Sequence, residues 1–313
     1  MKYDNQSIKQ SVIDGLKKYY GIETDSIVFK PVGEESYSYL AIDKNGEQYF
    51  VKYCEKANVT KNIDLVNQLL IQLKEFDFVV PPVESEGKTS FNLLSGKIYV
   101  YPYIVGEIVT IGNDRFEKEL VDKLLDIMVK IHSSKDKVTI ELPIENFEND
   151  FLADFGKLLA LFNDKKDKVD SEVLLVLKSN ENLIRKLIGE HTKLGEFYKN
   201  NKPSLVLTHG DITGRNIILA RDNLKLVDWD GAMIAPSERD LNFLLDNPHF
   251  SVDVYLRKMG KNNYDPKLKE YYGQQWALGS IIGNLENLLT MDLNAEDRAE
   301  YLEEAKEYLG YYQ

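Results

Sequence analysis

The stretch from residue 207 to 245 constrains the fold of this chain more than any other part. Within it, two short and largely apolar runs at 217–220 and 224–227 are typical of β-strands. They are separated by Arg221-Asp222-Asn223, residue types that form turns because their side chains bond to nearby backbone. The pattern predicts a β-hairpin.

This hairpin is expected to bring oxygen ligands together at its open end. Asn216 and Asp228 each lie six residues from Asp222, so a simple register places them opposite each other, with Cβ atoms roughly 5 Å apart. An amide oxygen and a carboxylate suit Mg²⁺, which takes one or two protein oxygens and completes its shell with water and phosphate oxygens. Asp211 precedes Asn216 by five residues, close enough to accept a proton from a hydroxyl that attacks a metal-bound phosphate. The arrangement predicts phosphoryl transfer.

The same residues resemble the catalytic and metal-binding loops of kinases: His209-Gly210-Asp211, four intervening residues, Asn216 and then Asp228. HGD in place of HRD, and VDWD in place of a DFG segment, are similar to the aminoglycoside phosphotransferase family. The sequence WDGAMIAPSERDLNFL resembles the spectinomycin phosphotransferase subgroup of that family. HGDxxxxN arises by chance in about one chain in 500 of this length, at about 5% for each fixed residue.

The resemblance implies ATP as phosphate donor and Mg²⁺ as cofactor. It makes Asp211 the general base and Asn216 and Asp228 the Mg²⁺ ligands. Lys52, in the sequence YFVKY, is implied to contact the phosphates of ATP, for which a point positive charge is suited. Kinases pair this lysine with a glutamate on the following helix, where this chain offers Asp64 or Gln68.

Further nucleotide contacts are expected from two segments. The loop PVGEESYSY contains one glycine, Gly33, and its backbone, with that of Ser36, is a candidate cradle for phosphate. The family's interlobe hinge, which presents backbone groups to adenine, corresponds here to Tyr101, Pro102, Tyr103 and Ile104. A tyrosine-rich strand is equally typical of an ordinary core.

On the substrate side, Asp230 is a candidate contact for a cationic group, or else a turn residue. Glu238, Arg239 and Asp240 are expected to open or cap a helix under the substrate site, with Glu238 as a second substrate contact and Arg239 in a structural ion pair. His209 is expected to orient the catalytic loop through hydrogen bonds, whereas His132 is interpreted as a core residue.

The first hundred residues predict a five-stranded, mostly antiparallel sheet with a helix. One hairpin is expected to turn at Asn45-Gly46 and another at Ser95-Gly96. The helix between them starts near Lys61 and is expected to end before Pro81-Pro82, because proline cannot donate a backbone hydrogen bond.

Beyond residue 106 the pattern becomes helical, beginning with a capping box at Asp114 and Glu117 and continuing in an apolar stripe through Leu124, Met128 and Ile131. The predicted fold is α+β. The resemblance implies a bilobal, protein-kinase-like fold with an ATP-binding lobe over 1–105 and a catalytic and substrate-binding lobe over 106–313.

Composition narrows the partners and the location. The 313 residues carry 39 Lys and Arg against 51 Asp and Glu, a net charge of −12 that repels nucleic acid and anionic membranes, so we expect neither as a partner. The single cysteine, Cys54, excludes an internal disulfide, and no apolar run approaches the roughly 18 residues that span a bilayer. A cytoplasmic protein is expected.

The prediction is an ATP- and Mg²⁺-dependent kinase that phosphorylates a hydroxyl of a small, cationic molecule such as spectinomycin or another aminocyclitol. One alternative is a metabolic kinase for an amino alcohol such as choline, for homoserine or for a sugar. Another is a catalytically weak, kinase-like binding or structural protein. A protein kinase is disfavoured because the segment from Asp228 to Asp240, where an activation loop and its anchor would be needed, is short and leaves little room for peptide docking.

Overall fold

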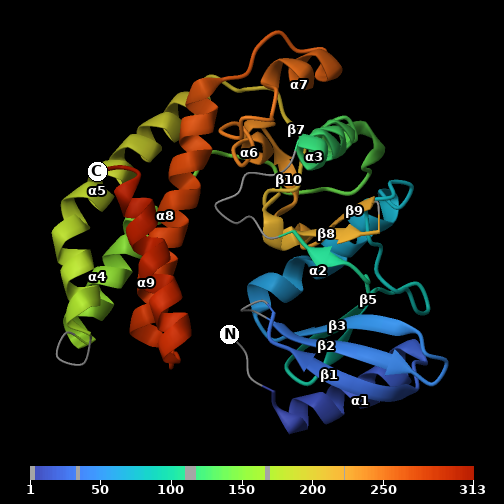
Figure 1. Ribbon diagram of the computed structural model, residues 1–313. Coiled ribbons are helices and arrows are strands. Elements are labelled where there is room, and N and C mark those ends of the chain that lie inside the picture. Colours follow the sequence, from blue (N-terminus) through green and yellow to red (C-terminus); the bar gives the residue numbers. More distant parts are fainter. Residues whose placement is uncertain (1–3, 33–35, 110–117, 166–169, 222) are drawn as a thin grey trace. The chain divides into compact units, whose positions relative to one another are not determined.

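The computed structural model describes residues 4–32, 36–109, 118–165, 170–221 and 223–313. Near the N-terminus, antiparallel strands form a five-stranded sheet in the order β1-β2-β3-β5-β4 (Figure 1). The strands are β1 (Thr24–Lys30), β2 (Ser36–Asp43), β3 (Gln48–Cys54), β4 (Ser90–Leu93) and β5 (Gly96–Pro102). This sheet confirms the predicted antiparallel arrangement and the α+β class.

The two faces of this sheet are covered by two helices, α1 (Gln6–Tyr20) and α2 (Ala57–Gln72) (Figure 1). On one face Leu16 of α1 packs in a cluster with Val51 of β3. On the other face Ile63 of α2 packs with Cys54. Because successive strand side chains point to opposite faces, Lys52 lies on the face that α2 covers.

The first predicted hairpin is confirmed, but its turn is longer than Asn45-Gly46 alone. The amide of Gly46 donates to the carbonyl of Asp43 (3.0 Å), and Gly46 has a left-handed backbone with φ +85°. A turn closed by a left-handed glycine is the usual form of a three-residue hairpin loop.

The second hairpin turns at Leu94-Ser95, one residue earlier than predicted, because Leu93 and Gly96 are already paired. A Cβ atom at Gly96 would lie 2.0 Å from the carbonyl oxygen of Cys54. Glycine is therefore required there by the close approach of the neighbouring backbone, not by the turn.

The predicted start of α2 is too late, and the prolines are not what ends the helix. The helix starts at Ala57, before Lys61, and ends at Gln72, well before Pro81-Pro82. Its N-cap residue is Lys56, whose side chain makes no capping bond, so the start carries no sequence signal of the usual kind. The prolines instead precede the return of the chain to the sheet, where the amide of Val83 donates to the carbonyl of Val100 (2.8 Å).

The stretch 207–245 forms several short strands. With β6 (Glu107–Ile108) they form the sheet β6-β8-β9 and the pair β10-β7, with bounds β7 (Val206–Thr208), β8 (Ile217–Ala220), β9 (Asn223–Leu226) and β10 (Met233–Ala235). The amide of Leu226 donates to the carbonyl of Phe78 (2.9 Å), which ties β9 to the segment that follows α2.

The hairpin β8–β9 confirms the predicted element, but the predicted register is wrong by one residue. Ala220 pairs with Asn223, so the turn contains two residues instead of three. Asn216 is therefore level with Val227, whose amide donates to its carbonyl (3.0 Å). Asp228 lies one residue further on, in the left-handed region with φ +64°, a conformation that costs a non-glycine residue on the order of 1–3 kcal/mol and is concentrated at functional sites.

Helices complete this part of the chain: α3 (Lys118–His132), α6 (Glu238–Leu241) and α7 (Val252–Met259), with 3-10 turns η1 (Lys135–Lys137), η2 (Gly214–Asn216) and η3 (Trp229–Gly231). The apolar stripe of α3 is confirmed, since Leu124, Met128 and Ile131 are buried. The predicted capping box at Asp114 and Glu117 lies outside the described residues.

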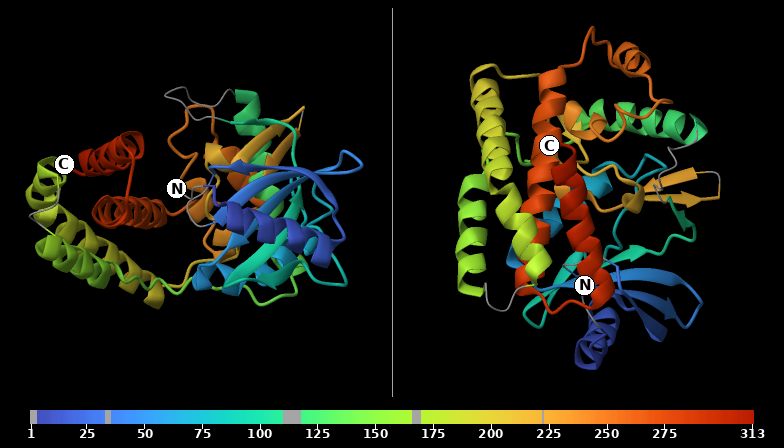
Figure 2. Two further views of the ribbon diagram at one scale, coloured as in Figure 1. Left: turned by 90° about the horizontal axis from the view of Figure 1, so that it is seen from below. Right: turned by 60° about the vertical axis from the view of Figure 1, so that its left-hand side comes forward.

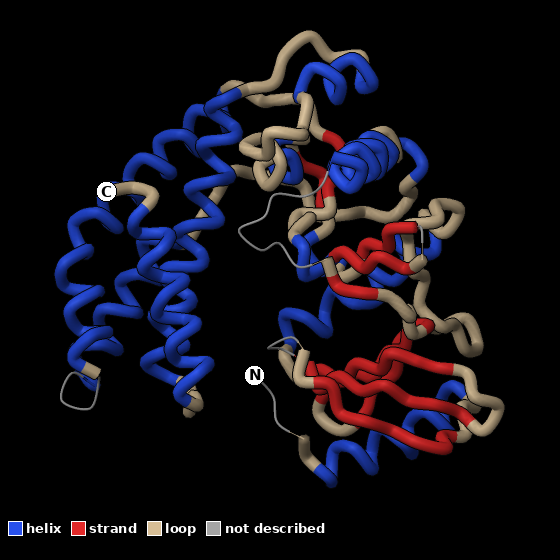
Figure 3. Tube along the Cα trace, viewed as in Figure 1, coloured by secondary structure: helices blue, strands red, loops and turns tan. Residues whose placement is uncertain are grey.

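A separate helical unit is formed by α4 (Phe151–Lys165), α5 (Ser171–Asn200), α8 (Pro266–Thr290) and α9 (Ala295–Gly310) (Figures 2 and 3). Its core joins apolar residues of all four helices, among them Phe155, Leu177, Leu285 and Ala305.

By its internal contacts the chain divides into two compact units, one with residues 1–144 and 206–262 and the other with 145–205 and 263–313. The five-stranded sheet and the stretch 207–245 belong to the first unit. The lobe boundary near residue 105 stays a prediction. No helix in the described ranges has the length and apolar character needed to span a membrane.

Candidate active site

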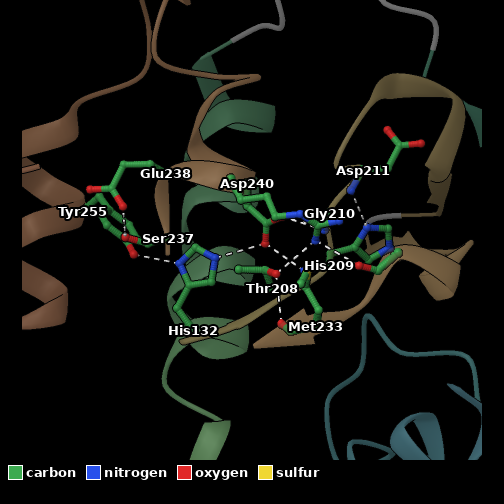
Figure 4. Close-up of polar contacts among 12 residues, drawn as sticks. His132, Thr208, His209, Gly210, Asp211, Met233, Ser237, Glu238, Asp240 and Tyr255 are labelled. Atoms are coloured by element: carbon green, nitrogen blue, oxygen red, sulfur yellow. Dashed lines mark hydrogen bonds and ion pairs between the residues drawn. The ribbon is translucent and has the colours of Figure 1, made fainter. Parts of the chain in front are cut away.

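A buried carboxylate holds the backbone of the loop that follows β7. The amide of His209 donates to Oδ2 of Asp240 (2.9 Å), and the amide of Gly210 donates to Oδ1 (2.7 Å) (Figure 4). Asp240 belongs to α6 and is fully buried. Burial alone would raise its pKa, but the neighbouring His132 and Arg239 outweigh burial and lower it, so the carboxylate is charged. Two charge-assisted bonds thus fix the peptide groups that precede Asp211.

The side chain of Arg239 fills the space beside Gly210. Its Nη1 donates to Oγ1 of Thr208 (3.1 Å) and to the carbonyl of Gly231 (2.9 Å). Gly210 has φ +94°, and a Cβ atom on it would lie 2.1 Å from this Nη1. Glycine is favoured here, because any other residue would strain the backbone and displace the neighbouring guanidinium.

His209 is fixed inside the loop by a bond at each ring nitrogen. Nε2 lies 3.1 Å from the carbonyl of Val227, and the amide of Asp211 donates to Nδ1 (3.2 Å). A carbonyl only accepts, so the proton is on Nε2 and the ring is neutral. Burial lowers the pKa of His209, which favours this neutral form. The expected hydrogen-bonding role of His209 within the loop is confirmed.

Asp211 and Asn216 are in direct contact. Nδ2 of Asn216 donates to Oδ2 of Asp211 (2.8 Å) and to its carbonyl oxygen (3.1 Å). The other carboxylate oxygen of Asp211, Oδ1, is buried and has no hydrogen-bond donor among the residues that the structure describes. Buried polar atoms are rarely left without a partner. The carboxylate is therefore held through one oxygen, while the second keeps an acceptor position that no described residue uses.

Lys52 of β3 forms an ion pair with Asp228, and Nζ lies 3.1 Å from Oδ1. The Lys52 ammonium lowers the pKa of the half-exposed Asp228 more than partial loss of hydration raises it. Burial would lower the pKa of Lys52, but Asp228 and the more distant Asp230 outweigh it, so the pKa lies above its ordinary value. Both partners are charged at neutral pH. The expected phosphate contact and an expected metal ligand thus lie side by side.

Helix α2 gives Lys52 no carboxylate partner. The single acidic residue within the helix is Asp64, and it accepts bonds from Lys97 (2.5 Å) and Ser90 (2.5 Å). Gln68 is exposed. Neither of the two candidates that the sequence offered bonds to Lys52 in the described structure, whose partner is Asp228 instead.

The expected phosphate cradle is described in part. Ser36 is the first residue of β2, and its Oγ lies 3.3 Å from the hydroxyl of Tyr99. Tyr99 pairs with Lys52 across β3 and β5, so Ser36 and Lys52 share one neighbour. Gly33 lies outside the described residues.

The segment from Tyr101 to Ile104 follows the sheet directly. The hydroxyl of Tyr101 donates to Oδ1 of Asn67 on α2 (2.8 Å), so this side chain is directed at the helix. The amide of Tyr103 donates to the carbonyl of Gln48 (3.0 Å). Backbone contacts to adenine from this segment stay a prediction, and they must use groups other than the Tyr103 amide.

Asp230 lies in η3, two residues after Asp228, and is exposed. Its charge contributes to the raised pKa of Lys52. The structure therefore places this carboxylate near the ion pair.

Glu238 lies away from Asp211. It is buried, and its Oε2 accepts a bond from Oγ of Ser237 (3.2 Å). Figure 4 shows Glu238 next to Ser237 and Tyr255, on the opposite side of Asp240 from Asp211. Its expected contact with substrate stays a prediction.

The buried contact of Asp240 with the loop is the feature that the sequence interpretation missed. Asp240 was expected to cap a helix, and His132, whose Nε2 lies 3.1 Å from it, was expected to be an ordinary core residue. Little in the sequence indicated this contact, because Asp240 stands in the polar run Ser237-Glu238-Arg239-Asp240, which is equally typical of an exposed helix start.

The donor set fits a divalent cation that binds together with phosphate. Nδ2 of Asn216 is used on Asp211, so its amide oxygen and the carboxylate of Asp228 would be the groups that hold such a cation. Nowhere in the described ranges do three or more His, Cys, Asp or Glu residues form a group that could hold a metal. A few hard oxygen ligands are what Mg²⁺ uses at phosphate sites.

The sequence profile of the phosphotransferase enzyme family matches residues 28–279, most of the chain. The chain belongs to this family. It is therefore a phosphotransferase that acts as a small-molecule kinase, which confirms the predicted class of enzyme.

Individual relatives are distant. Protein StrN of Streptomyces griseus is 24% identical over 256 residues, which cover 76% of this phosphotransferase and 75% of StrN. Spectinomycin phosphotransferase APH(9)-Ia, solved with ADP and spectinomycin, is 22% identical with a TM-score of 0.72, covering 98% of this chain and 95% of that one. Choline kinase LicA from Streptococcus pneumoniae is 17% identical with a TM-score of 0.61, covering 98% and 100%. The likenesses to the two solved structures show a shared fold.

Proposed function

We propose that this phosphotransferase moves the terminal phosphate of ATP to a hydroxyl of a small molecule, with Asp211 as general base. The observation that carries the proposal is the Asp211 carboxylate, with one oxygen bonded to Asn216 at 2.8 Å and the other buried without a donor in the described structure. The substrate oxygen bonds to the γ-phosphorus, the bond from that phosphorus to the bridging oxygen of ADP breaks, and the hydroxyl proton passes to Asp211.

Lys52 is proposed to hold the phosphates of ATP, with the backbone at Gly33 and Ser36, and the segment from Tyr101 to Ile104 is proposed to receive adenine. Structures of relatives that hold ADP or GDP support a nucleotide at this fold. Asn216 and Asp228 would hold Mg²⁺, which supplies neutralisation of the phosphate charge when bound. This chain's own residues then orient the hydroxyl and remove its proton.

The acceptor is proposed to be spectinomycin or a related cationic aminocyclitol, with Asp230 as the contact for its cationic group. The TM-score of 0.72 to a spectinomycin-bound phosphotransferase supports this choice over the 0.61 to a choline kinase. A net charge of −12 favours a cationic acceptor of either kind. An amino alcohol such as choline is therefore the second candidate.

The experiment is ADP release from ATP and MgCl₂ over a panel of spectinomycin, aminoglycosides, choline, homoserine and simple sugars. Asp211→Asn is the control, because an amide oxygen still accepts the bond from Asn216 but takes no proton. We expect one aminocyclitol to stimulate ADP release, and the control to lose that stimulation. Stimulation by choline alone would show that the acceptor is an amino alcohol and not an aminocyclitol. Stimulation that survives in Asp211→Asn would contradict the assignment of Asp211 as general base.

A further inference from the structure

Behind Asp240, on the side away from the catalytic loop, buried hydrogen bonds continue through two more helices. Nε2 of His132, at the end of α3, lies 3.1 Å from Oδ2 of Asp240. Nδ1 of the same ring lies 2.7 Å from the hydroxyl of Tyr255 in α7. His132 is 2% exposed, and Tyr255 and Asp240 are 0% exposed. Figure 4 shows the three side chains in a row that ends at the loop.

The two ring nitrogens of His132 are thus engaged on opposite sides. A charged carboxylate only accepts, so Nε2 carries a proton and donates to Asp240. Nδ1 bonds to the hydroxyl of Tyr255 at 2.7 Å. Tyr255 thereby holds the ring in the orientation in which Nε2 faces Asp240.

Asp240 in turn has both oxygens engaged on the loop. Oδ2 is shared by the amide of His209 and by His132, while Oδ1 accepts from the amide of Gly210. The donor on His132 opposes rotation of the carboxylate away from these amides. A buried carboxylate that loses a donor turns toward other partners, because leaving it unpaired is costly.

We propose that His132 and Tyr255 are positioning residues for Asp211, acting through Asp240 on the two peptide groups before it. The inference rests on the proposed role of Asp211 as base. A displacement of about 1 Å at a reacting group can cost roughly 10²-fold in rate, so loss of this support lowers kcat. Lys52, the proposed phosphate contact, is on β3 and does not take part in this row, so KM for ATP is unaffected.

The first variant is Tyr255→Phe, which removes a single hydroxyl. Its matched control is Tyr198→Phe in the other compact unit, where a tyrosine that is 2% exposed donates to Oδ2 of Asp265 at 2.7 Å. The assay uses MgATP with spectinomycin, or, without spectinomycin, the slow hydrolysis of ATP by water. We expect Tyr255→Phe to lower kcat 3- to 10-fold and to change KM for ATP less than 2-fold. The control keeps kcat within 2-fold.

The second pair of variants tests the route through His132. His132→Gln retains an N–H donor near the position of Nε2, so kcat falls less than 5-fold, whereas His132→Leu lowers it at least 10-fold. In the His132→Leu background, Tyr255→Phe has no further effect, because the leucine side chain offers neither a partner for Tyr255 nor a donor for Asp240. A full effect of Tyr255→Phe in that background overturns the proposed route.

A readout without turnover is the amide resonance of Gly210 in protein labelled with ¹⁵N-glycine, assigned by its loss or shift in Asp240→Asn. We expect it to move in Tyr255→Phe and His132→Leu and to stay in place in Tyr198→Phe, with folding checked by thermal melts. A resonance and a kcat that both stay unchanged in folded Tyr255→Phe overturn the inference. If wild-type protein consumes no ATP while the resonance moves as expected, the proposed function fails and the positioning of the loop stands.

Discussion

Gly210→Ala is a demanding test of how the catalytic loop is packed. Its backbone has φ +94°, which costs an L-residue roughly 1–2 kcal/mol. The new Cβ would lie 2.1 Å from Nη1 of Arg239, so the guanidinium must move. It then gives up its bonds to Thr208 and to Gly231, each worth about 1.5–3 kcal/mol when the donor is charged. Taking the low end for a partly exposed arginine, we expect a loss of about 4 kcal/mol of unfolding free energy.

The assay is urea unfolding followed by the fluorescence of Trp229, in a Trp276→Phe background that leaves one tryptophan. Gly210→Ala, Arg239→Ala and the double variant form a cycle. Arg239→Ala alone already gives up both bonds, so adding Gly210→Ala should cost only the backbone part, and the two single losses should exceed the double loss by about 3 kcal/mol. Losses that add to within about 0.5 kcal/mol would show that Arg239 is not what excludes a side chain at Gly210.

Three further predictions concern other parts of the chain. Burial lowers the pKa of His191 to about 4, below its unfolded value of about 6.5. The free energy of unfolding is therefore highest above pH 6.5 and decreases as the pH falls, by about 2 kcal/mol at pH 5. His191→Phe should remove this decrease in urea titrations at pH 7.5 and pH 5, and an equal decrease in the variant would contradict the prediction. Lys52→Met should weaken ATP binding at least about 10-fold, measured by calorimetry, whereas Lys97→Met, which removes the partner of an acid on α2, should change it less than 2-fold; equal losses would refute the role of Lys52. Removing divalent cations with EDTA should abolish ADP release, and Asp228→Asn should raise the Mg²⁺ concentration for half-maximal activity roughly 10- to 100-fold; full turnover in EDTA would exclude the metal.

Features that depend only on residues close together in the sequence could be predicted from it. The hairpin at residues 43–47 and the buried stripe of α3 follow from turn types and periodicity, which act over a few residues. The start of α2 was missed because Lys56 makes no capping bond. The register of β8–β9 was missed because a two-residue turn and a three-residue turn are both compatible with Arg221-Asp222-Asn223, and one residue decides which side chains are level.

Long-range contacts were beyond such reasoning unless a motif indicated them. Lys52 and Asp228 are 176 residues apart, and the motifs of the family, not periodicity, placed both at the phosphates. His132 and Asp240 are 108 residues apart, and none of the sequence motifs on which the prediction rested includes both. Only the folded backbone shows that this buried charge is directed at the loop that carries Asp211.

The most direct measurement compares Asp211→Asn with wild-type protein, taking kcat and the Kd for MgATP from the same preparations. If Asp211 accepts the proton of the attacking hydroxyl, kcat should fall about 10²- to 10⁴-fold, while the Kd for MgATP stays within 2-fold because the amide keeps the bond to Asn216. A kcat within 10-fold of wild type, with MgATP still bound, would contradict the role of Asp211 as general base.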